Sequence, residues 1–148
     1  MTQVDLSALE LDGIEDIEEP HAMPAGEYLV RVANAEFRNS KAGNPMLQLI
    51  CEFPDEPNAA GVFDFTMLVT KDTPEKSKAR MLLDLRRKFH AFDVPYSSTG
   101  FDPGAFIGQE CTMYVAVEQD QNGIDRNRLT PSPIPKGAET PKGDPKPF

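Results

Sequence analysis

The sequence predicts an all-β domain with one helix. Several segments alternate apolar and polar residues with the period of two that strands require, whereas a single segment spaces its apolar residues by three and four, as helices do. The predicted order is three strands, the helix between strands 3 and 4, and then two more strands. This is the element order of the OB-fold, a five-stranded Greek-key barrel whose strand 2–3 face and two loops bind oligonucleotides or oligosaccharides.

The first two strands are expected to form a hairpin. Tyr and Val at every second position of residues 28–33 mark the first strand, and residues 46–53 resume the extended pattern. Between them, residues 38–45 (RNSKAGNP) are rich in turn-forming residues. We therefore expect a first loop that carries two cations, Arg38 and Lys41.

The remaining elements follow in order. Residues 61–69 (GVFDFTMLV) read as the third strand, and the helix is expected over residues 74–92, with Thr73 as its N-cap and Pro74 at its first position. Its apolar face, which we expect to pack on the core, comprises Met81, Leu82, Leu85, Phe89 and Phe92. Residues 109–118 and 126–130 are the predicted fourth and fifth strands, separated by an Asn-Gly turn.

The formal charge of −9 is concentrated at the N-terminus. Residues 1–30 contain eight acids and no Lys or Arg, and the chain as a whole has 24 acids and 15 bases. The residues after position 30 are therefore nearly neutral, with sixteen acids against fifteen bases. We expect an acidic flexible arm over residues 1–23, an OB-fold domain over 24–131 and a Pro/Gly/Lys-rich disordered tail over 132–148.

The sequence also argues against several classes of protein. No apolar run approaches the roughly 20 residues of a membrane span, and the N-terminus lacks the features of a secretory signal. Cys51 and Cys111 lie in apolar strand patterns, so we expect buried reduced thiols in a cytoplasmic protein. His21 and His90 are the only histidines, and no zinc-binding, phosphate-loop or nucleophile-elbow motif occurs. We therefore expect a non-catalytic protein without a metal or cofactor.

Three stretches give the chain a resemblance to a known family. They are PAGEYLV at residues 24–30, SKAGNPML at residues 40–47 and FIGQ at residues 106–109. Over roughly residues 24–131 the chain resembles the phage-encoded OB-fold single-stranded-DNA-binding proteins. The resemblance implies an OB-fold, sequence-tolerant binding of single strands and a role in phage DNA replication or recombination.

The resemblance extends to the C-terminus in part. The better-known replication proteins of this type end in an acidic tip with a terminal Phe, through which they recruit partners. This chain keeps Phe148, but residues 144–147 (DPKP) before it are not acidic. Phe148 is therefore a candidate partner-binding residue by resemblance.

Sequence-tolerant binding of a single strand requires cations along the phosphates and aromatic rings on which bases stack. The candidate cations are Arg31 on the first strand, Arg38 and Lys41 in the first loop, and Arg126 and Arg128 after the last turn. The candidate stacking residues are Phe37 and Tyr114, which we expect to be exposed, and Phe63 and Phe65, which fit either the core or an exposed platform.

The predicted helix carries six further cations: Lys76, Lys78, Arg80, Arg86, Arg87 and Lys88. We interpret them as a solvated helix face, with an electrostatic track or a partner surface as the alternative. A Lys/Arg-rich last turn also suits the helix dipole.

These features predict a non-catalytic protein that coats single-stranded DNA in phage replication or recombination. The alternative is a protein-interaction or structural phage module that uses the same barrel without nucleic acid. Phage replication or recombination proteins are the expected partners, through the acidic arm or the C-terminal tail. The arm is expected either to compete with DNA for the cationic groove or to recruit a basic partner.

Overall fold

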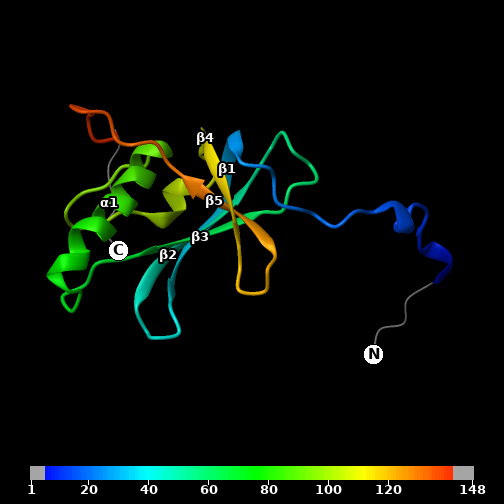
Figure 1. Cartoon of the computed structure of the whole chain (residues 1–148), viewed down its shortest axis with the longest axis horizontal. Helices are drawn as coiled ribbons and strands as arrows, with labels where there is room; N and C mark the ends of the chain where they lie inside the picture. Colours follow the sequence, from blue (N-terminus) through cyan, green and yellow to red (C-terminus); the bar gives the residue numbers. More distant parts are fainter. Residues whose placement is uncertain (1–5, 142–148) are drawn as a thin grey trace.

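The computed structural model describes residues 6–141, and its centre is one antiparallel sheet of five strands that curls into a nearly closed barrel (Figure 1). The strands are β1 (Gly26–Asn39), β2 (Pro45–Glu52), β3 (Val62–Met67), β4 (Glu110–Gln119) and β5 (Asp125–Thr130), and the helix α1 (Glu75–Ala91) lies between β3 and β4. The sheet order is β3-β2-β1-β4-β5, and β5 approaches β3 to close the barrel. The predicted all-β class with one helix and an OB-like strand order is confirmed.

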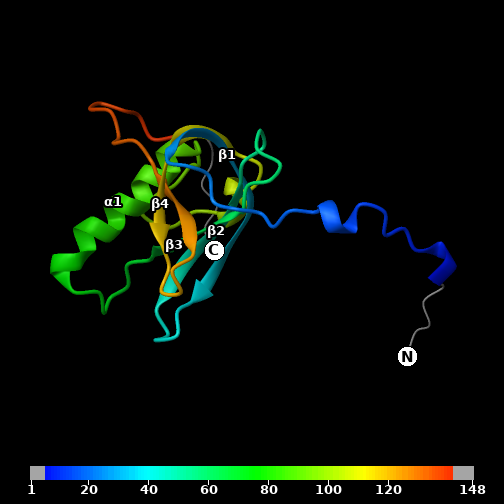
Figure 2. The same cartoon turned by 45° about the vertical axis from the view of Figure 1, so that its right-hand side comes forward.

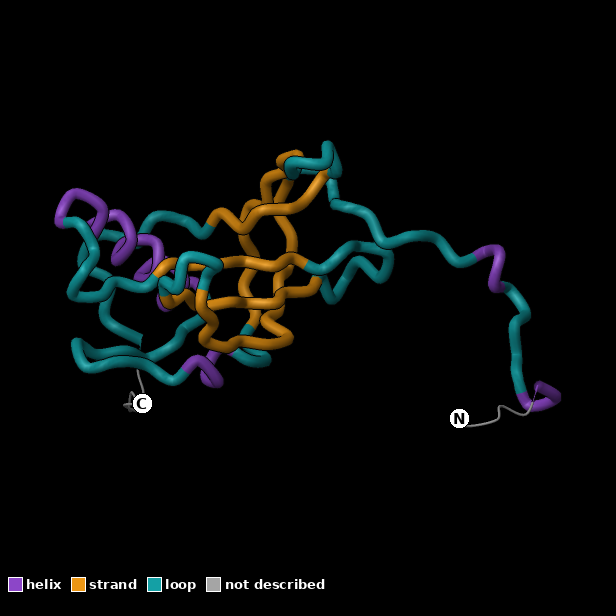
Figure 3. The backbone as a smooth tube through the Cα atoms, turned by 90° about the horizontal axis from the view of Figure 1, so that it is seen from below, coloured by secondary structure: helices purple, strands orange, loops and turns teal. Residues whose placement is uncertain are grey.

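The core of the barrel is formed by alternate side chains of the strands. The most deeply buried of them are Val30, Val32, Leu47, Leu49, Cys51, Met113 and Val115. Phe92 and Phe106 belong to the same core cluster and are almost fully buried. Seen from below, the strands form the wall of the barrel while α1 and its flanking loops lie to one side (Figure 3). Both cysteines are free thiols, with Cys51 buried and Cys111 half-buried.

A β-bulge in β1 changes which residues face inward. The register with β2 shifts between Val32 and Asn34, so that the buried positions pass from Val32 to Ala35. A bulge inserts one extra residue and bends the strand. β1 pairs with β4 from Gly26 to Arg31 and with β2 from Arg31 to Asn39. After the bulge, the odd-numbered side chains of β1 point inward and the even-numbered ones point outward.

The start of α1 differs from the prediction. Pro74 is the N-cap, with ψ of 137°, and Glu75 is the first helical residue. Thr73 is not the cap, because its hydroxyl accepts a hydrogen bond from the Thr70 N–H at 2.9 Å in the preceding turn. No side chain caps the helix, so the first free N–H groups of α1 have no side-chain acceptor.

The buried face of α1 also differs in part. Phe89 is buried as expected, and Phe92 is buried at the C-cap position. Leu82 is 46% exposed, so its assignment to the core was wrong. Lys88, expected on a solvated face, is instead only 7% exposed because it is paired with a carboxylate of β3.

The N-terminal arm projects away from the barrel. Residues 7–20 are all exposed, and the arm leaves the molecule on the side opposite α1 (Figures 1 and 2). The chain is first held at His21, whose N–H donates to the Asn58 carbonyl and whose carbonyl accepts from the Ala60 N–H. Met23 then enters the core. Within residues 6–141, no helix has the length and apolarity required to cross a membrane.

Candidate nucleic-acid interface

An open groove of about 530 Å³ runs over the outer surface of β2 and β3 beside the β1–β2 loop. We call it the β2–β3 groove. Its lining includes four of the predicted binding residues, which come from two separate segments of the chain: Arg38, Lys41, Phe63 and Phe65. This is the face that OB-folds use for oligonucleotides or oligosaccharides.

The two phenylalanines stand outward on β3. Phe63 is 61% exposed and Phe65 is 52% exposed. The opposite face of β3 supplies the inward side chains, with Val62 and Thr66 both buried. The sequence left open whether Phe63 and Phe65 belong to the core or to an exposed stacking platform. The structure shows that both are exposed.

Gln48 forms the floor of the groove and was not singled out in the sequence. It lies on β2 directly opposite Phe65 and, on its other side, opposite Glu36 of β1. Although it points to the outer face, it is only 5% exposed. Its Oε1 accepts a hydrogen bond from Nη1 of Arg38 at 3.2 Å, so the guanidinium is tied to the floor of the groove. In the sequence, the signal for this position was a single polar residue within the apolar run from Met46 to Ile50.

The β1–β2 loop holds Lys41 at the end of the groove. The Ser40 N–H donates to the Asn44 carbonyl at 2.8 Å, and Gly43 closes the turn with φ of 84°, a value that favours glycine. Lys41 is exposed, and none of the described residues forms an ion pair with it. Arg38 was expected in this loop, but the structure places it on β1, just before the loop begins.

A second hollow of about 340 Å³ continues the groove past Phe65, which lines both. It contains Arg128 of β5 and Arg87 of α1. Nε of Arg87 is buried and has no hydrogen-bond partner among the described residues. The path from Lys41 over Phe63 and Phe65 to Arg128 thus combines cations at both ends with aromatic rings between them.

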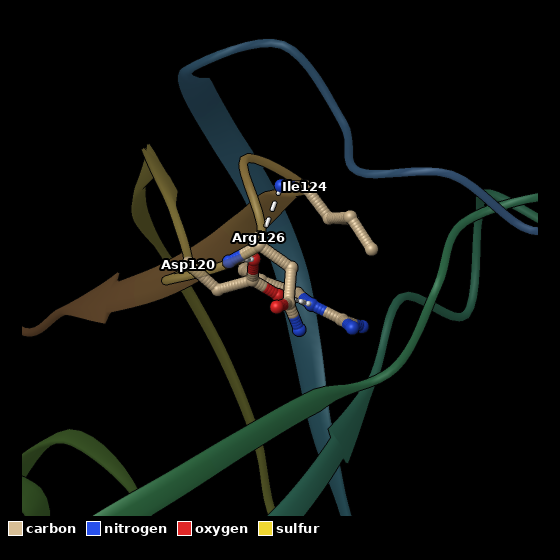
Figure 4. Close-up of polar contacts among 4 residues, drawn as sticks. Asp120, Ile124 and Arg126 are labelled. Carbon is tan, nitrogen blue, oxygen red and sulfur yellow. Dashed lines mark hydrogen bonds and ion pairs between the residues drawn. The ribbon is translucent and has the colours of Figure 1, made fainter.

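Arg126 forms an ion pair with Asp120 of the β4–β5 loop (Figure 4). The Asp120 carboxylate accepts hydrogen bonds from the N–H groups of Ile124 at 3.0 Å and Asn122 at 2.8 Å, and from Nε of Arg126 at 3.1 Å. The backbone hydrogen bond from Ile124 is the main cause that lowers the pKa of Asp120, with Asn122 and Arg126 adding to it. Arg126 therefore stabilises the loop carboxylate.

Three other predicted residues lie outside the β2–β3 groove. Arg31 forms ion pairs with Glu52, at 2.5 Å, and with Glu110, at 3.9 Å. Phe37 points to the other side of β1 because of the bulge. Its ring packs edge-on against that of Phe101, with 5.4 Å between the ring centroids. Tyr114 is 51% exposed on β4, where its strand neighbours are Glu27 and Thr130. Phe148 lies outside the described residues.

Carboxylates accompany most cations of this surface. Arg38 lies 3.5 Å from Glu36, and Arg128 lies 3.3 Å from Glu118. Exposed ion pairs of this kind contribute only about 0–1 kcal/mol, so an incoming phosphate can replace the carboxylate at little cost. The electrostatic attraction of the groove for a polyanion is correspondingly modest. Within residues 6–141, no group of three or more His, Cys, Asp or Glu side chains is placed to hold a metal ion.

Comparison with families of known proteins gives a match that covers most of the chain. No curated protein matches the chain. Residues 13–128, which include the whole barrel apart from the end of β5, match the model of a family described as "Protein of unknown function (DUF669)". The chain therefore belongs to the DUF669 family.

Proposed function

We propose that this protein binds single-stranded DNA without catalysis and without strong sequence preference, in phage DNA replication or recombination. The observation that carries the proposal is the pair of exposed rings, Phe63 and Phe65, which stand side by side on β3 between Lys41 and Arg128. Rings that are more than half exposed add less to the stability of the barrel than buried ones, and exposed rings flanked by cations are what stacking of single-stranded bases requires.

Base stacking supplies most of the affinity in this proposal. Each base stacked on an aromatic ring contributes about 1–3 kcal/mol. The cations contribute less, because Arg38 and Arg128 already face carboxylates. Duplex DNA keeps its bases paired and stacked, so it does not offer them to Phe63 and Phe65. The assignment to phage replication or recombination is supported by the resemblance in residues 24–30, 40–47 and 106–109.

Fluorescence anisotropy with labelled oligo-dT and a labelled duplex, each at two salt concentrations, tests the proposal. We expect oligo-dT to bind at micromolar protein in low salt and the duplex to bind far more weakly. If oligo-dT does not bind under those conditions, the proposal fails. The barrel would then be a protein-interaction or structural module that does not use nucleic acid.

A further inference from the structure

A second groove, separate from the β2–β3 groove, runs along α1 and is mainly apolar. It has a volume of about 750 Å³ and shares no lining residue with the β2–β3 groove. We call it the α1 groove. Its apolar lining includes Phe37, Leu68, Leu82, Leu85, Phe89 and Tyr96.

Two arginines of α1 lie at the α1 groove or next to it. Among the described residues, Arg86 is the one charged residue in the lining of the groove, and Arg80 lines a smaller adjoining hollow that shares Leu68 with the groove and also contains Asp72. Leu82, between these two arginines on the helix, exposes 46% of its surface. An occupant of this groove therefore needs aliphatic side chains together with negative charge.

The N-terminal arm of the same chain has this composition. Leu11, Ile14 and Ile17 are 61%, 60% and 78% exposed. The acids between and after these three residues are Asp12, Glu15, Asp16, Glu18 and Glu19. No Lys or Arg precedes Arg31 in the sequence.

The three aliphatic residues of the arm are spaced by three in the sequence and are all exposed. The Ile14 N–H donates to the Leu11 carbonyl at 3.1 Å, and residues Ile14–Asp16 form a 3₁₀ turn. Gly13 precedes this turn with φ of 81° and Ile17 follows it in an extended conformation, so Leu11 and Ile17 lie outside the turn. The segment therefore offers three separate aliphatic side chains, with acids between them, to an apolar groove.

We propose that the arm of one copy docks, through Leu11, Ile14 and Ile17, in the α1 groove of a second copy. The arm leaves the barrel at His21, on the side opposite α1, and extends away from the molecule (Figures 1 and 2). Its acids complement Arg80 and Arg86 of the second copy. An interface between two different surfaces repeats head to tail. If the proposed function holds, such contacts align neighbouring barrels along one DNA strand.

Sedimentation velocity of the full chain without DNA tests this docking, so the result does not depend on whether the protein binds nucleic acid. We expect the wild-type chain to self-associate as its concentration rises. The arm variant Leu11→Ser/Ile14→Ser/Ile17→Ser and the groove variant Leu82→Glu should each weaken association about tenfold or more, the scale of a lost hot spot. Leu83→Glu is the matched control, because Leu83 is 39% exposed on the same helix but does not line the groove.

Mixing the two defective variants gives a sharper result. The arm variant keeps an intact groove and the groove variant keeps an intact arm, so together they should form a 1:1 complex that grows no further. Circular dichroism verifies that each variant is folded. A wild-type chain that stays monomeric would overturn the proposal and assign the groove to another occupant, such as the residues that follow Thr140. Equal effects of Leu82→Glu and Leu83→Glu, or no complex in the mixture, would also overturn it.

Discussion

Nζ of Lys88 on α1 lies 2.5 Å from Oδ2 of Asp64 on β3, and the two side chains are only 9% and 12% exposed. Lys88 also donates to the hydroxyl of Thr66 on the same strand. This ion pair is a buried polar contact between α1 and the barrel. It also holds the helix beside Phe65, since Asp64, Phe65 and Lys88 line one hollow.

Replacing Lys88 by Met is therefore expected to destabilise the protein strongly. The Asp64 carboxylate would remain buried without its partner, which typically costs about 3–5 kcal/mol. Urea denaturation measures the change in the free energy of unfolding. The double variant Lys88→Met/Asp64→Asn should recover much of the loss, because it leaves no buried charge. Lys78→Met, at an exposed position of the same helix, should change stability by less than about 0.5 kcal/mol. Similar losses for Lys88→Met and Lys78→Met would contradict this role.

Removing either outward ring of β3 should weaken binding of single-stranded DNA while the fold persists. We expect Phe63→Ala and Phe65→Ala each to cost about 1–3 kcal/mol of binding free energy, measured by anisotropy with oligo-dT. Both side chains are more than half exposed, so thermal unfolding should change little. Tyr114→Ala is the matched control, since it removes a ring of similar exposure from β4. If Tyr114→Ala weakens binding as much as the β3 variants, the DNA lies across β4 instead of the β2–β3 groove.

The sequence predicted the strands and the helix well because their periodicity is local. Period-two alternation placed β2, β3, β4 and β5 to within two residues, whereas β1 continues six residues beyond the predicted residues 28–33, to Asn39. Alternation cannot tell which face points inward when both carry apolar residues, and Val62 competes with Phe63 in this respect. Only the closure of the barrel decides it.

The errors arise from tertiary structure. The bulge after Val32 turns Phe37 away from the β2–β3 groove and Arg38 toward it, and the single Asn34 within a strand pattern is not enough to predict a bulge. Lys88 looks like one more solvated cation until the fold brings Asp64 to it. Gln48 was missed because its burial depends on side chains of the neighbouring strands.

The salt dependence of binding should be shallow and should depend on Lys41. Each phosphate neutralised on a single strand contributes a slope of about −0.7 to the plot of log affinity against log salt. Lys41 has no ion pair with any described residue, so it is the cation most available to a phosphate. Lys41→Gln should reduce the magnitude of the slope by about 0.7. Lys76→Gln, which removes an exposed charge from α1, should leave it unchanged. An equal change for both variants would show that only overall charge matters.

The buried thiol of Cys51 should resist alkylation until the barrel unfolds. Burial, and to a lesser extent the charge of Asp64, raises the pKa of Cys51 from its ordinary value of 9.0 to about 12. The thiolate is the reactive form, so at about pH 8 the folded protein holds almost none of it at this position. Because the folded pKa is the higher one, the stability linked to the neutral thiol is complete below pH 9.0 and is lost as the pH rises toward 12.

Mass spectrometry after treatment with iodoacetamide measures this protection. Cys111 provides an internal comparison: burial raises its pKa too, but its side chain is only half-buried, so it should react first. In urea both cysteines should react at similar rates. Urea midpoints should also fall between pH 9 and pH 12 in the wild type and fall less in Cys51→Ala. Rapid labelling of Cys51 in the absence of urea would mean that the β1–β2 wall opens without global unfolding.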